Sequence, residues 1–321
     1  TPNPPPAVRA ELEAAVRRLL RLKDGAGAAA LLTGANAHLD RWGPGGLAQL
    51  TDACLTELPP SATLRGVLLL LRARLRLARA DVTGARADAE EAWRLLPWDV
   101  EPPRLVAHAR IRQRDLDGAA QALERGLTTT QRAPAILMER GLLALHRGAV
   151  RAAATDFRAA REGFEAVGDL AGAIQAELRQ ALAAFQSGDL AAAVPALQAV
   201  VTRTRDLGLT HLGAVARWYL AWVALERADD GVAARLAGEA LDAWTTRGDQ
   251  QGEARARGLL GVVALLAGDL SAASRAFDDA EAAPERSADP PFTVLLLEAR
   301  AILLALQDEP VRARAALAEA T

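Results

Sequence analysis

Cysteine is nearly absent from this sequence of 321 residues, which contains Cys54 and no other. A single cysteine excludes an internal disulfide framework and a zinc site built from cysteine ligands. Cys54 stands in the segment TDACLTEL, where apolar residues recur at helical spacing. We therefore expect a buried, unreactive thiol in a reducing compartment.

Long apolar runs are also absent. The longest uncharged apolar segment, Leu259–Ala267, is about half as long as a membrane-spanning helix requires. The first residues, TPNPPPAVRAELE, have no apolar stretch behind a basic start, so they do not read as a signal peptide. The formal net charge of −2 gives no global indication of binding to nucleic acid or to an acidic membrane. We expect a soluble, cytoplasmic protein that contacts neither a membrane nor, through these residues, nucleic acid directly.

Aromatic residues make up only 4% of the chain and β-branched residues are sparse. The residues that dominate are Ala, Leu, Arg and Glu, which favour helices, and the apolar fraction of 51% allows a large core. We therefore predict an all-α fold. Because the sequence begins at Thr1 and its only methionine is Met138, we expect a fragment of a longer protein, with residues 1–7 as a linker stub.

The main positive feature is an internal repeat, in which an acidic residue is followed four positions later by alanine. Successive copies lie 34, 34, 40, 40, 40 and 40 residues apart, and one copy has lost the acid. Fixed periods of this size are typical of stacked helix pairs, so we predict a right-handed superhelical solenoid of antiparallel pairs. The copies are Asp81/Ala85, Asp115/Ala119, Ala149/Ala153, Asp189/Ala193, Asp229/Ala233, Asp269/Ala273 and Glu309/Ala313.

Each copy is an apolar helix, a tight turn and a second helix. In the segment 259–286, Gly261 and Ala273 are small where two helices have to approach closely. Phe277 lies on the same helix face as Ala273 and is expected to fill the space that the small residues leave. The pattern recurs as Gly141, Ala153 and Phe157, while Leu123 or Leu197 replaces the phenylalanine elsewhere.

These residues carry a family resemblance. The small residue followed by A-x3-F-x2-A resembles the tetratricopeptide repeat (TPR), and the 40-residue units resemble its longer-helix variant. That variant is common in bacterial transcription regulators of the maltose-activator (MalT) type and in large ATP-binding LuxR-family regulators. Residues 8–60 resemble the N-terminal helical segment of that domain and residues 61–321 its repeats, in one continuous α-solenoid. The resemblance implies a sensor domain, while the ATPase and DNA-binding modules of those regulators lie outside this sequence.

No motif indicates catalysis. The phosphate-binding sequence G-x-x-x-x-G-K-[ST] and the nucleophile motif G-x-S-x-G are both absent. No pair of histidines has the spacing of a helical zinc site, since the four histidines stand on four different units. We expect a non-enzymatic protein without a cofactor or metal. The histidines are His38, His108, His146 and His211.

A solenoid binds its partners along its concave wall, which the first helix of each pair forms. Counting residues at helical spacing back along each first helix from its turn gives the side chains expected to face the groove. They predict a basic strip at one end of this groove and an apolar region at the other. The basic and apolar ends would suit an anionic, partly apolar partner such as a peptide. The inward residues are Arg104, His108, Arg112, Met138, Leu142, Leu178, Phe185, Trp218 and Trp222.

Two interpretations stay open for the ends of this groove. Trp218 and Trp222 either pack in the core or expose an aromatic anchor. The basic strip is either solvated or captures a carboxylate or phosphate. Trp42, Trp93, Trp98 and Trp244 are expected to pack between repeats.

Two functions therefore remain. One is a sensor domain of a bacterial transcription regulator, which binds a protein, a peptide or a small effector in the groove. The other is a freestanding adaptor that mediates protein–protein interactions without a transcriptional role.

Overall fold

A computed structural model describes residues 6–35, 47–59, 63–129, 133–282 and 290–320. These residues form seventeen α-helices and no strand, so the predicted all-α class is confirmed. The chain divides into two compact units, residues 1–188 and 189–321.

The first unit contains α1 (Pro6–Arg21), α2 (Gly25–Ala35), α4 (Leu47–Glu57), α5 (Thr63–Ala78), α6 (Val82–Leu95), α7 (Glu101–Arg112), α8 (Leu116–Thr129), α9 (Pro134–His146), α10 (Val150–Ala166) and α11 (Leu170–Gln186). The second unit contains α12 (Leu190–Leu207), α13 (Thr210–Glu226), α14 (Asp230–Arg247), α15 (Gln250–Leu266), α16 (Leu270–Glu281), α17 (Pro290–Leu306) and α18 (Pro310–Ala320).

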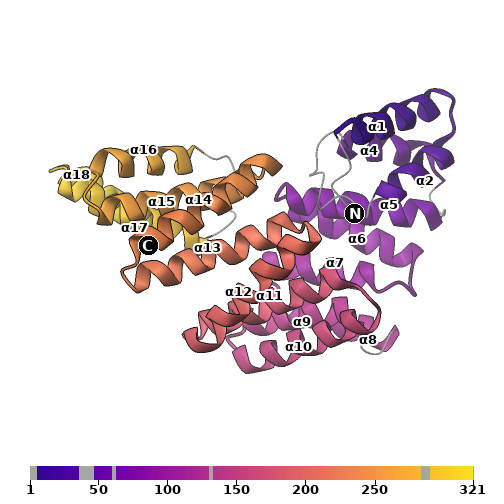
Figure 1. Cartoon of the computed structure of the whole chain (residues 1–321). Coiled ribbons are helices and arrows are strands. Elements are labelled where there is room, and N and C mark those ends of the chain that lie inside the picture. The colour runs from indigo at the N-terminus through magenta and orange to yellow at the C-terminus, as the bar shows by residue number, and fades with distance from the viewer. Residues whose placement is uncertain (1–5, 36–46, 60–62, 130–132, 283–289, 321) are drawn as a thin grey trace. The chain divides into compact units, whose positions relative to one another are not determined.

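Within each unit, helices that follow one another in the chain pack side by side as antiparallel pairs (Figure 1). The pairs α5–α6, α7–α8 and α9–α10 belong to the first unit, and α13–α14, α15–α16 and α17–α18 to the second. Each pair also packs on the next, as α6 does on α7 and α14 on α15. The predicted stacking of antiparallel pairs is confirmed within the units. The division between the units falls inside the pair predicted around Asp189, so a single solenoid over 8–321 stays a prediction.

The close approach predicted for the repeat is confirmed. A Cβ atom placed on Gly261 would lie 2.5 Å from Phe277 Cε1, and one on Gly141 would lie 2.5 Å from Phe157 Cε1. Both phenylalanines are completely buried. The glycines therefore leave the space into which the rings pack, and where the second helix carries a smaller residue the same position holds alanine. Examples are Ala107 with Leu123, Ala181 with Leu197 and Ala221 with Ala237.

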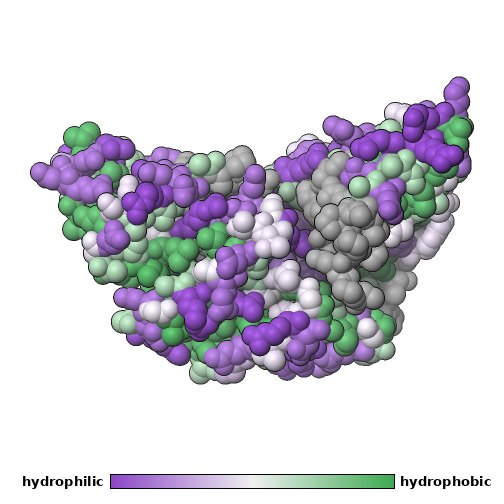
Figure 2. Space-filling view, turned by 45° about the horizontal axis from the view of Figure 1, so that its top comes forward, coloured by the Kyte–Doolittle hydropathy of each residue, from purple (hydrophilic) through white to green (hydrophobic). Residues whose placement is uncertain are grey.

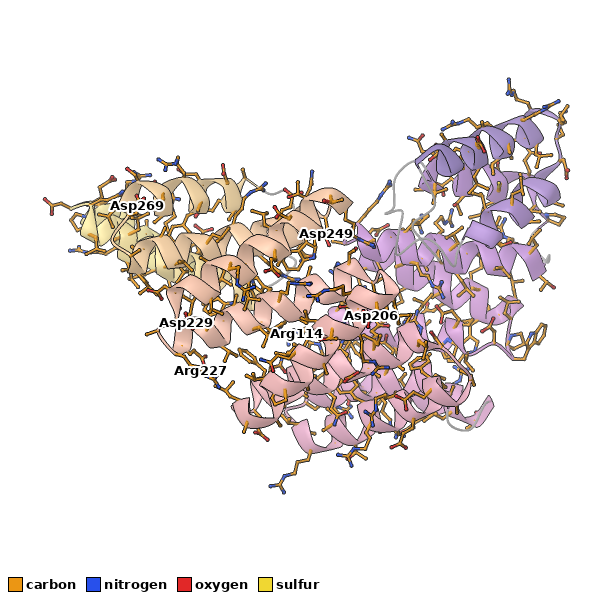
Figure 3. All side chains as sticks on the ribbon, viewed as in Figure 1. Arg114, Asp206, Arg227, Asp229, Asp249 and Asp269 are labelled. Atoms are coloured by element: carbon orange, nitrogen blue, oxygen red, sulfur yellow. The ribbon has the colours of Figure 1, made fainter. Side chains whose placement is uncertain are left out.

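The acidic residue of the repeat caps the N-terminus of the second helix. Its carboxylate accepts a hydrogen bond from the backbone N–H three residues later, which satisfies a donor that a helix start leaves free. The repeat pattern placed these residues in turns without predicting the cap. The same cap also precedes the first helices α11 and α15. The caps are Asp81, Asp115, Asp169, Asp189, Asp229, Asp249 and Asp269, of which Figure 3 labels the last three.

The turns between helices pass through the left-handed region of backbone conformation. Glycine takes this conformation in several turns, for example Gly188 with φ 78° and Gly268 with φ 79°. Other turns place a residue with a side chain there, namely Ala80 (φ 60°), Arg114 (φ 63°) and Ala228 (φ 56°). A residue with a side chain in this region is less stable than glycine by about 1 kcal/mol.

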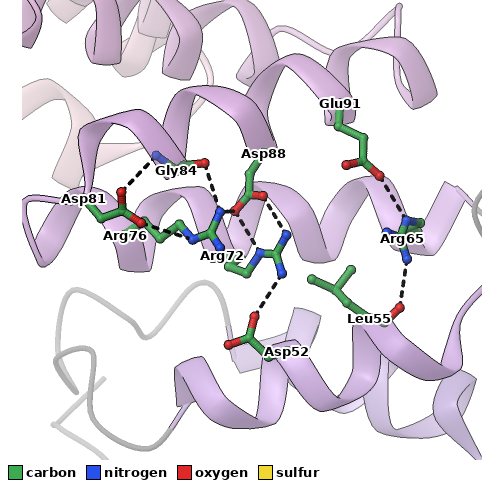
Figure 4. Close-up of polar contacts among 9 residues, drawn as sticks. All are labelled: Asp52, Leu55, Arg65, Arg72, Arg76, Asp81, Gly84, Asp88 and Glu91. Atoms are coloured by element: carbon green, nitrogen blue, oxygen red, sulfur yellow. Dashed lines mark hydrogen bonds and ion pairs between the residues drawn. The ribbon is translucent and has the colours of Figure 1, made fainter.

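Arginines on α5 connect it to α4 and α6 (Figure 4). Arg72 donates to both carboxylate oxygens of the buried Asp88 at 2.7 and 2.8 Å, and to Asp52 at 2.9 Å. Arg76 adds a second partner for Asp88 at 2.8 Å. Removing one member of such a buried pair costs about 3–5 kcal/mol, so these contacts fix how the helices pack.

The tryptophans differ in burial. Trp244 is buried against Gly252, as predicted, and its Nε1 donates to His211 Nδ1 at 3.3 Å. Trp93 is partly buried, with Arg125 4.5 Å above its ring. Trp98 is 64% exposed, so the packing predicted for it is wrong: it follows Pro97 in the turn beyond α6, where no helix covers it. Trp42 lies outside the described residues.

The helices at the end of the second unit leave apolar side chains exposed, among them Ile302, Leu306, Val311 and Leu317. In the space-filling view, hydrophobic patches lie between hydrophilic residues (Figure 2). No described helix combines the length and the apolar character that crossing a bilayer demands.

Candidate binding surface

A network of charged side chains links the first helices of the first unit. Glu101, at the start of α7, receives hydrogen bonds from Arg74 of α5 and from Arg104 one turn further along α7. Arg104 also donates to Glu139 of α9 at 3.0 Å. His108 Nδ1 lies 3.0 Å from Glu139 Oε2. These five residues, the first-helix network, join α5, α7 and α9.

The carboxylates of this network are held in their charged form. Burial acts to raise the pKa of Glu101, but Arg104 and Arg74 outweigh it and bring that pKa to about 2. Burial likewise opposes ionisation of Glu139, and His108 and Arg104 outweigh it, so the pKa of Glu139 lies below its ordinary value. Because Glu139 is an anion, the nitrogen that His108 points at it carries the proton. The network is thus a set of paired charges.

The predicted basic strip is therefore not three free cations. Arg104 and His108 are half-buried and paired with Glu139, whereas Arg112 is exposed and donates to the Leu77 carbonyl at 3.0 Å. Counting along one helix could not reveal Glu139, because it comes from the next pair.

The apolar residues predicted for the groove differ in accessibility. Met138, Leu142 and Phe185 are half-buried, and Met138 packs beside Leu137. Leu178 is buried, so its side chain is not available to a ligand in this conformation.

Trp218 belongs to the core of the second unit, which is the packing alternative for this residue. It is 8% exposed, and its Nε1 donates to the Arg255 carbonyl at 3.1 Å. Trp222 is half-buried and meets Trp218 edge-on, with ring centroids 5.9 Å apart. The indole nitrogen of Trp222 is itself buried without a hydrogen-bond partner among the described residues. Of the two rings, Trp222 is the one that keeps part of its surface accessible.

Three further basic side chains come from neighbouring elements of the first unit. Arg114 follows α7 (labelled in Figure 3), His146 ends α9, and Arg179 lies on α11. No side-chain hydrogen bond or ion pair joins any of them to another described residue. Partial desolvation, and then the charges of Arg114, His108 and Arg179, lower the pKa of His146 below its ordinary value.

The described residues contain no group of three or more His, Cys, Asp or Glu side chains that could hold a metal ion. Cys54 is buried, as predicted, and burial raises the pKa of its thiol to about 11.

No protein-family model matches the sequence, and no curated protein matches it either. Solved structures resemble it in fold. One is a signal-transduction ATPase with numerous domains and a tetratricopeptide repeat sensor from Pyrococcus horikoshii, with a TM-score of 0.60 and 14% identity. The similarity covers 85% of this chain but 43% of that protein, so this chain spans less than half of its length.

Two further structures match over most of this chain. A Rap protein in complex with competence and sporulation factor has a TM-score of 0.60 and 13% identity over 91% of this chain and 90% of its own. Yeast Tom70 has a TM-score of 0.55 and 14% identity over 92% of this chain and 54% of its own. At these identities the likeness concerns the fold alone. The fold is that of tetratricopeptide-like helical repeats.

Proposed function

We propose that this chain is a non-catalytic binding module that takes a protein, a peptide or a small effector on its first-helix face. The observation that carries the proposal is the make-up of this face in the first unit. Paired charges hold α5, α7 and α9 in register, while half-buried Met138 and Leu142 lie on the same helices as exposed Arg112. Apolar surface beside fixed cations suits an anionic, partly apolar ligand. The helix-repeat fold supports this use, since such folds present extended binding surfaces.

The module is further proposed to be the sensor of a bacterial transcription regulator, as a cytoplasmic domain without a cofactor. Support comes from the similarity in fold to the signal-transduction ATPase with a tetratricopeptide repeat sensor. In this proposal residues 1–7 are a linker, and 8–60 and 61–321 form one solenoid. Filling the surface would shift how neighbouring pairs pack, and such shifts add up along stacked repeats.

The alternative is a freestanding adaptor without a transcriptional role. This chain shares its kind of fold with yeast Tom70, at a TM-score of 0.55 over 92% of this chain, and the fold alone does not select a regulator. The domain order of the full-length gene separates the two. A phosphate-binding loop before this region or a helix-turn-helix after it supports the sensor, and the absence of both contradicts it.

Selection of peptides from a random display library tests the binding proposal. We expect the selected peptides to lose binding to Arg112→Gln and to Leu142→Ala. Arg158→Gln, which removes an exposed cation from the second helix α10, is the matched control and is expected to bind normally. Failure to enrich any peptide, or equal loss with Arg158→Gln, would count against the first-helix face, provided that circular dichroism shows each variant folded.

A further inference from the structure

The second unit leaves apolar side chains accessible on its first helices. Trp222 of α13, Val262 of α15 and Ile302 of α17 each stand seven residues before the acidic residue of their repeat. One turn further along, Leu266 and Leu306 stand three residues before that acidic residue on α15 and α17. The two positions share one face of each helix, because residues four apart are neighbours on a helix surface. We call these five residues the apolar stripe.

The apolar stripe continues across three helices and is open to solvent. Since α15 packs against both α13 and α17, equivalent positions on the three helices adjoin. Leu266, Ile302 and Leu306 are 61%, 56% and 60% exposed, while Trp222 and Val262 are half-buried. Contiguous apolar surface of this kind marks a place where another molecule binds.

The repeat itself does not require apolar residues at the most exposed end of this stripe. At the position of Leu266 and Leu306, the other five copies of the repeat carry small, polar or charged residues. The first helices that carry those residues pack against their neighbours as well. The two leucines therefore serve something other than contacts within the stack. The equivalent residues are Ala78, Arg112, His146, Gln186 and Glu226.

Negative charge borders the stripe at the edge where the helices turn. Glu226 is exposed at the end of α13, one turn beyond Trp222. Exposed aspartates stand in the turns after α13, α15 and α17, and the cation Arg227 offsets one of these charges (Figure 3). A partner that covers the stripe therefore meets a net negative border, which favours basic residues beside its apolar groups. The aspartates are Asp229, Asp269 and Asp308.

Three arginines on the same helices leave this negative border unchanged, because each is paired with a carboxylate of the second unit. Two of the carboxylates come from the second helices α14 and α16, and one from α15 itself. The pairs are Arg217 with Glu239 at 2.9 Å, Arg257 with Glu253 at 2.8 Å and Arg300 with Asp278 at 2.7 Å.

The surface suits a helix better than an extended peptide. The stripe offers apolar side chains, and the helices beneath it bond their backbone groups internally. An extended peptide would hold its own N–H and C=O groups over this apolar surface without partners, which is unfavourable. A helix pairs its backbone groups within itself and presents side chains alone.

We propose that the apolar stripe is a docking surface for an amphipathic helix of a partner protein, with basic residues flanking the apolar side of that helix. Axes of packed helices lie about 8–10 Å apart, so the stripe extends about 16–20 Å from α13 to α17. A helix covers that length in about 11–13 residues. Apolar residues at i, i+4, i+7 and i+11 then meet all three helices. The stripe belongs to the second unit, so this inference does not rest on the face of the first unit described above.

A labelled model peptide tests the proposal with the full chain. It is a helix of about 18 residues with leucine at i, i+4, i+7 and i+11 and lysine and alanine elsewhere. Fluorescence anisotropy measures its affinity at low and high salt. We expect it to bind at least about tenfold more tightly than the same peptide with glutamate in place of lysine, and to weaken as salt screens the charges. A version with a central proline, which breaks the helix, is expected to bind as poorly as the glutamate version.

Variants of the chain test the residues. Ile302→Lys and Leu306→Lys are each expected to weaken binding of the model peptide about tenfold or more, because an apolar contact is lost and like charges meet. Both residues are exposed, so the fold is expected to survive, and circular dichroism checks it. Val167→Lys, at a 73% exposed residue of the first unit, is the matched control and is expected to bind normally.

The negative border has its own pair of variants. Glu226→Gln is expected to weaken binding of the lysine peptide about threefold and to reduce its salt dependence. Glu124→Gln removes an exposed carboxylate from α8 of the first unit and is expected to change neither.

Sedimentation of the chain without peptide tests whether a second copy occupies the stripe instead. We expect a monomer at the concentrations used for binding. A dimer that Ile302→Lys abolishes would identify the stripe as a contact between copies and would overturn the proposal of a partner helix.

The proposal is also overturned if the glutamate or the proline peptide binds as tightly as the lysine peptide, or if Val167→Lys weakens binding as much as Ile302→Lys. Its failure can be told apart from failure of the proposed function. The model peptide is expected to bind Arg112→Gln and Leu142→Ala normally. Peptides selected through those two residues, without binding of the model peptide, would end this inference alone. Binding of the model peptide that requires Ile302 but not Arg112, without any selected peptide, would end the proposed function of the first unit alone.

Discussion

A single carboxylate can control the acid stability of the first unit. Glu101 has a pKa of about 2, against an ordinary value of 4.5, because Arg104 and Arg74 outweigh its burial. A carboxylate whose pKa is lower in the folded protein than in the unfolded chain stabilises the fold at pH values above its unfolded pKa. That contribution is lost as the pH falls from about 4.5 to about 2. The difference amounts to about 3 kcal/mol at neutral pH.

We predict that Glu101→Gln unfolds more easily at pH 7 and depends less on pH between about 5 and 2. Urea unfolding followed by circular dichroism at several pH values measures both effects. Glu124→Gln, an exposed residue on α8, is the matched control and should leave the pH dependence unchanged. An acid profile of Glu101→Gln that parallels the parent's would contradict the coupling to the arginines.

Cys54 reports on the opening of the first unit. Burial raises the pKa of its thiol from 9.0 to about 11, which lowers the reactive thiolate fraction about a hundredfold at neutral pH. We predict that a maleimide labels the native protein at least about a hundredfold more slowly than it labels the urea-unfolded chain. Mass spectrometry of the adduct measures the rate, and since the chain has one cysteine the signal has one source. Labelling of the native protein at the unfolded rate would show that α4 does not bury this thiol.

At the scale of the helix pair, the contact between Gly261 and Phe277 decides how closely α15 and α16 approach. We predict that Gly261→Ala destabilises the second unit by about 1–3 kcal/mol, since its methyl group would lie 2.5 Å from the ring. Gly238→Ala on α14 should instead stabilise by up to about 1 kcal/mol, because nothing lies within 4 Å of the added atom. Denaturant unfolding compares the two.

A double variant tests the same contact from both sides. Gly261→Ala with Phe277→Leu recreates the combination that Ala107 and Leu123 form in the first unit. It should recover part of the stability that Gly261→Ala alone loses. If Gly261→Ala proves as stabilising as Gly238→Ala, the glycine is not there to admit the ring.

The helix pairs were predictable because the pattern that specifies them is local and repeats. Gly261 and Phe277 belong to neighbouring helices of one pair, and the second copy at Gly141 and Phe157 made the contact recognisable. The caps were not predicted because, in the sequence alone, an aspartate that caps a helix cannot be distinguished from an aspartate in a turn. Asp169 and Asp249 show a sequence signal that could have identified them. Each follows a glycine, Gly168 or Gly248, and each precedes another glycine by three residues.

The site was harder to predict for a different reason. The spacing along α7 placed Arg104 and His108 on one face, but their partner Glu139 comes from the next pair. Arg179 comes from the pair after that. Contacts between residues of different helix pairs depend on how far each pair is rotated relative to the next. The spacing of residues within one helix carries no information about this rotation.

At the scale of the whole molecule, the repeat register continues through Asp189, yet the compact units divide there. Helices in stacked repeats are stabilised chiefly by their neighbours, so a cut between compact units should cost little. We predict that the fragments 1–188 and 189–321 each fold, with helical circular dichroism and a cooperative thermal transition.

A cut after Ala228 is the matched control. It separates α13 from α14 and exposes Trp218 and Ala221, which are buried in the second unit. The fragments 1–228 and 229–321 should therefore melt at lower temperature or aggregate. If the second cut is tolerated as well as the first, the units do not reflect how stability is distributed. If the fragment 189–321 is unfolded alone, the chain folds as the one continuous solenoid that the repeat predicts.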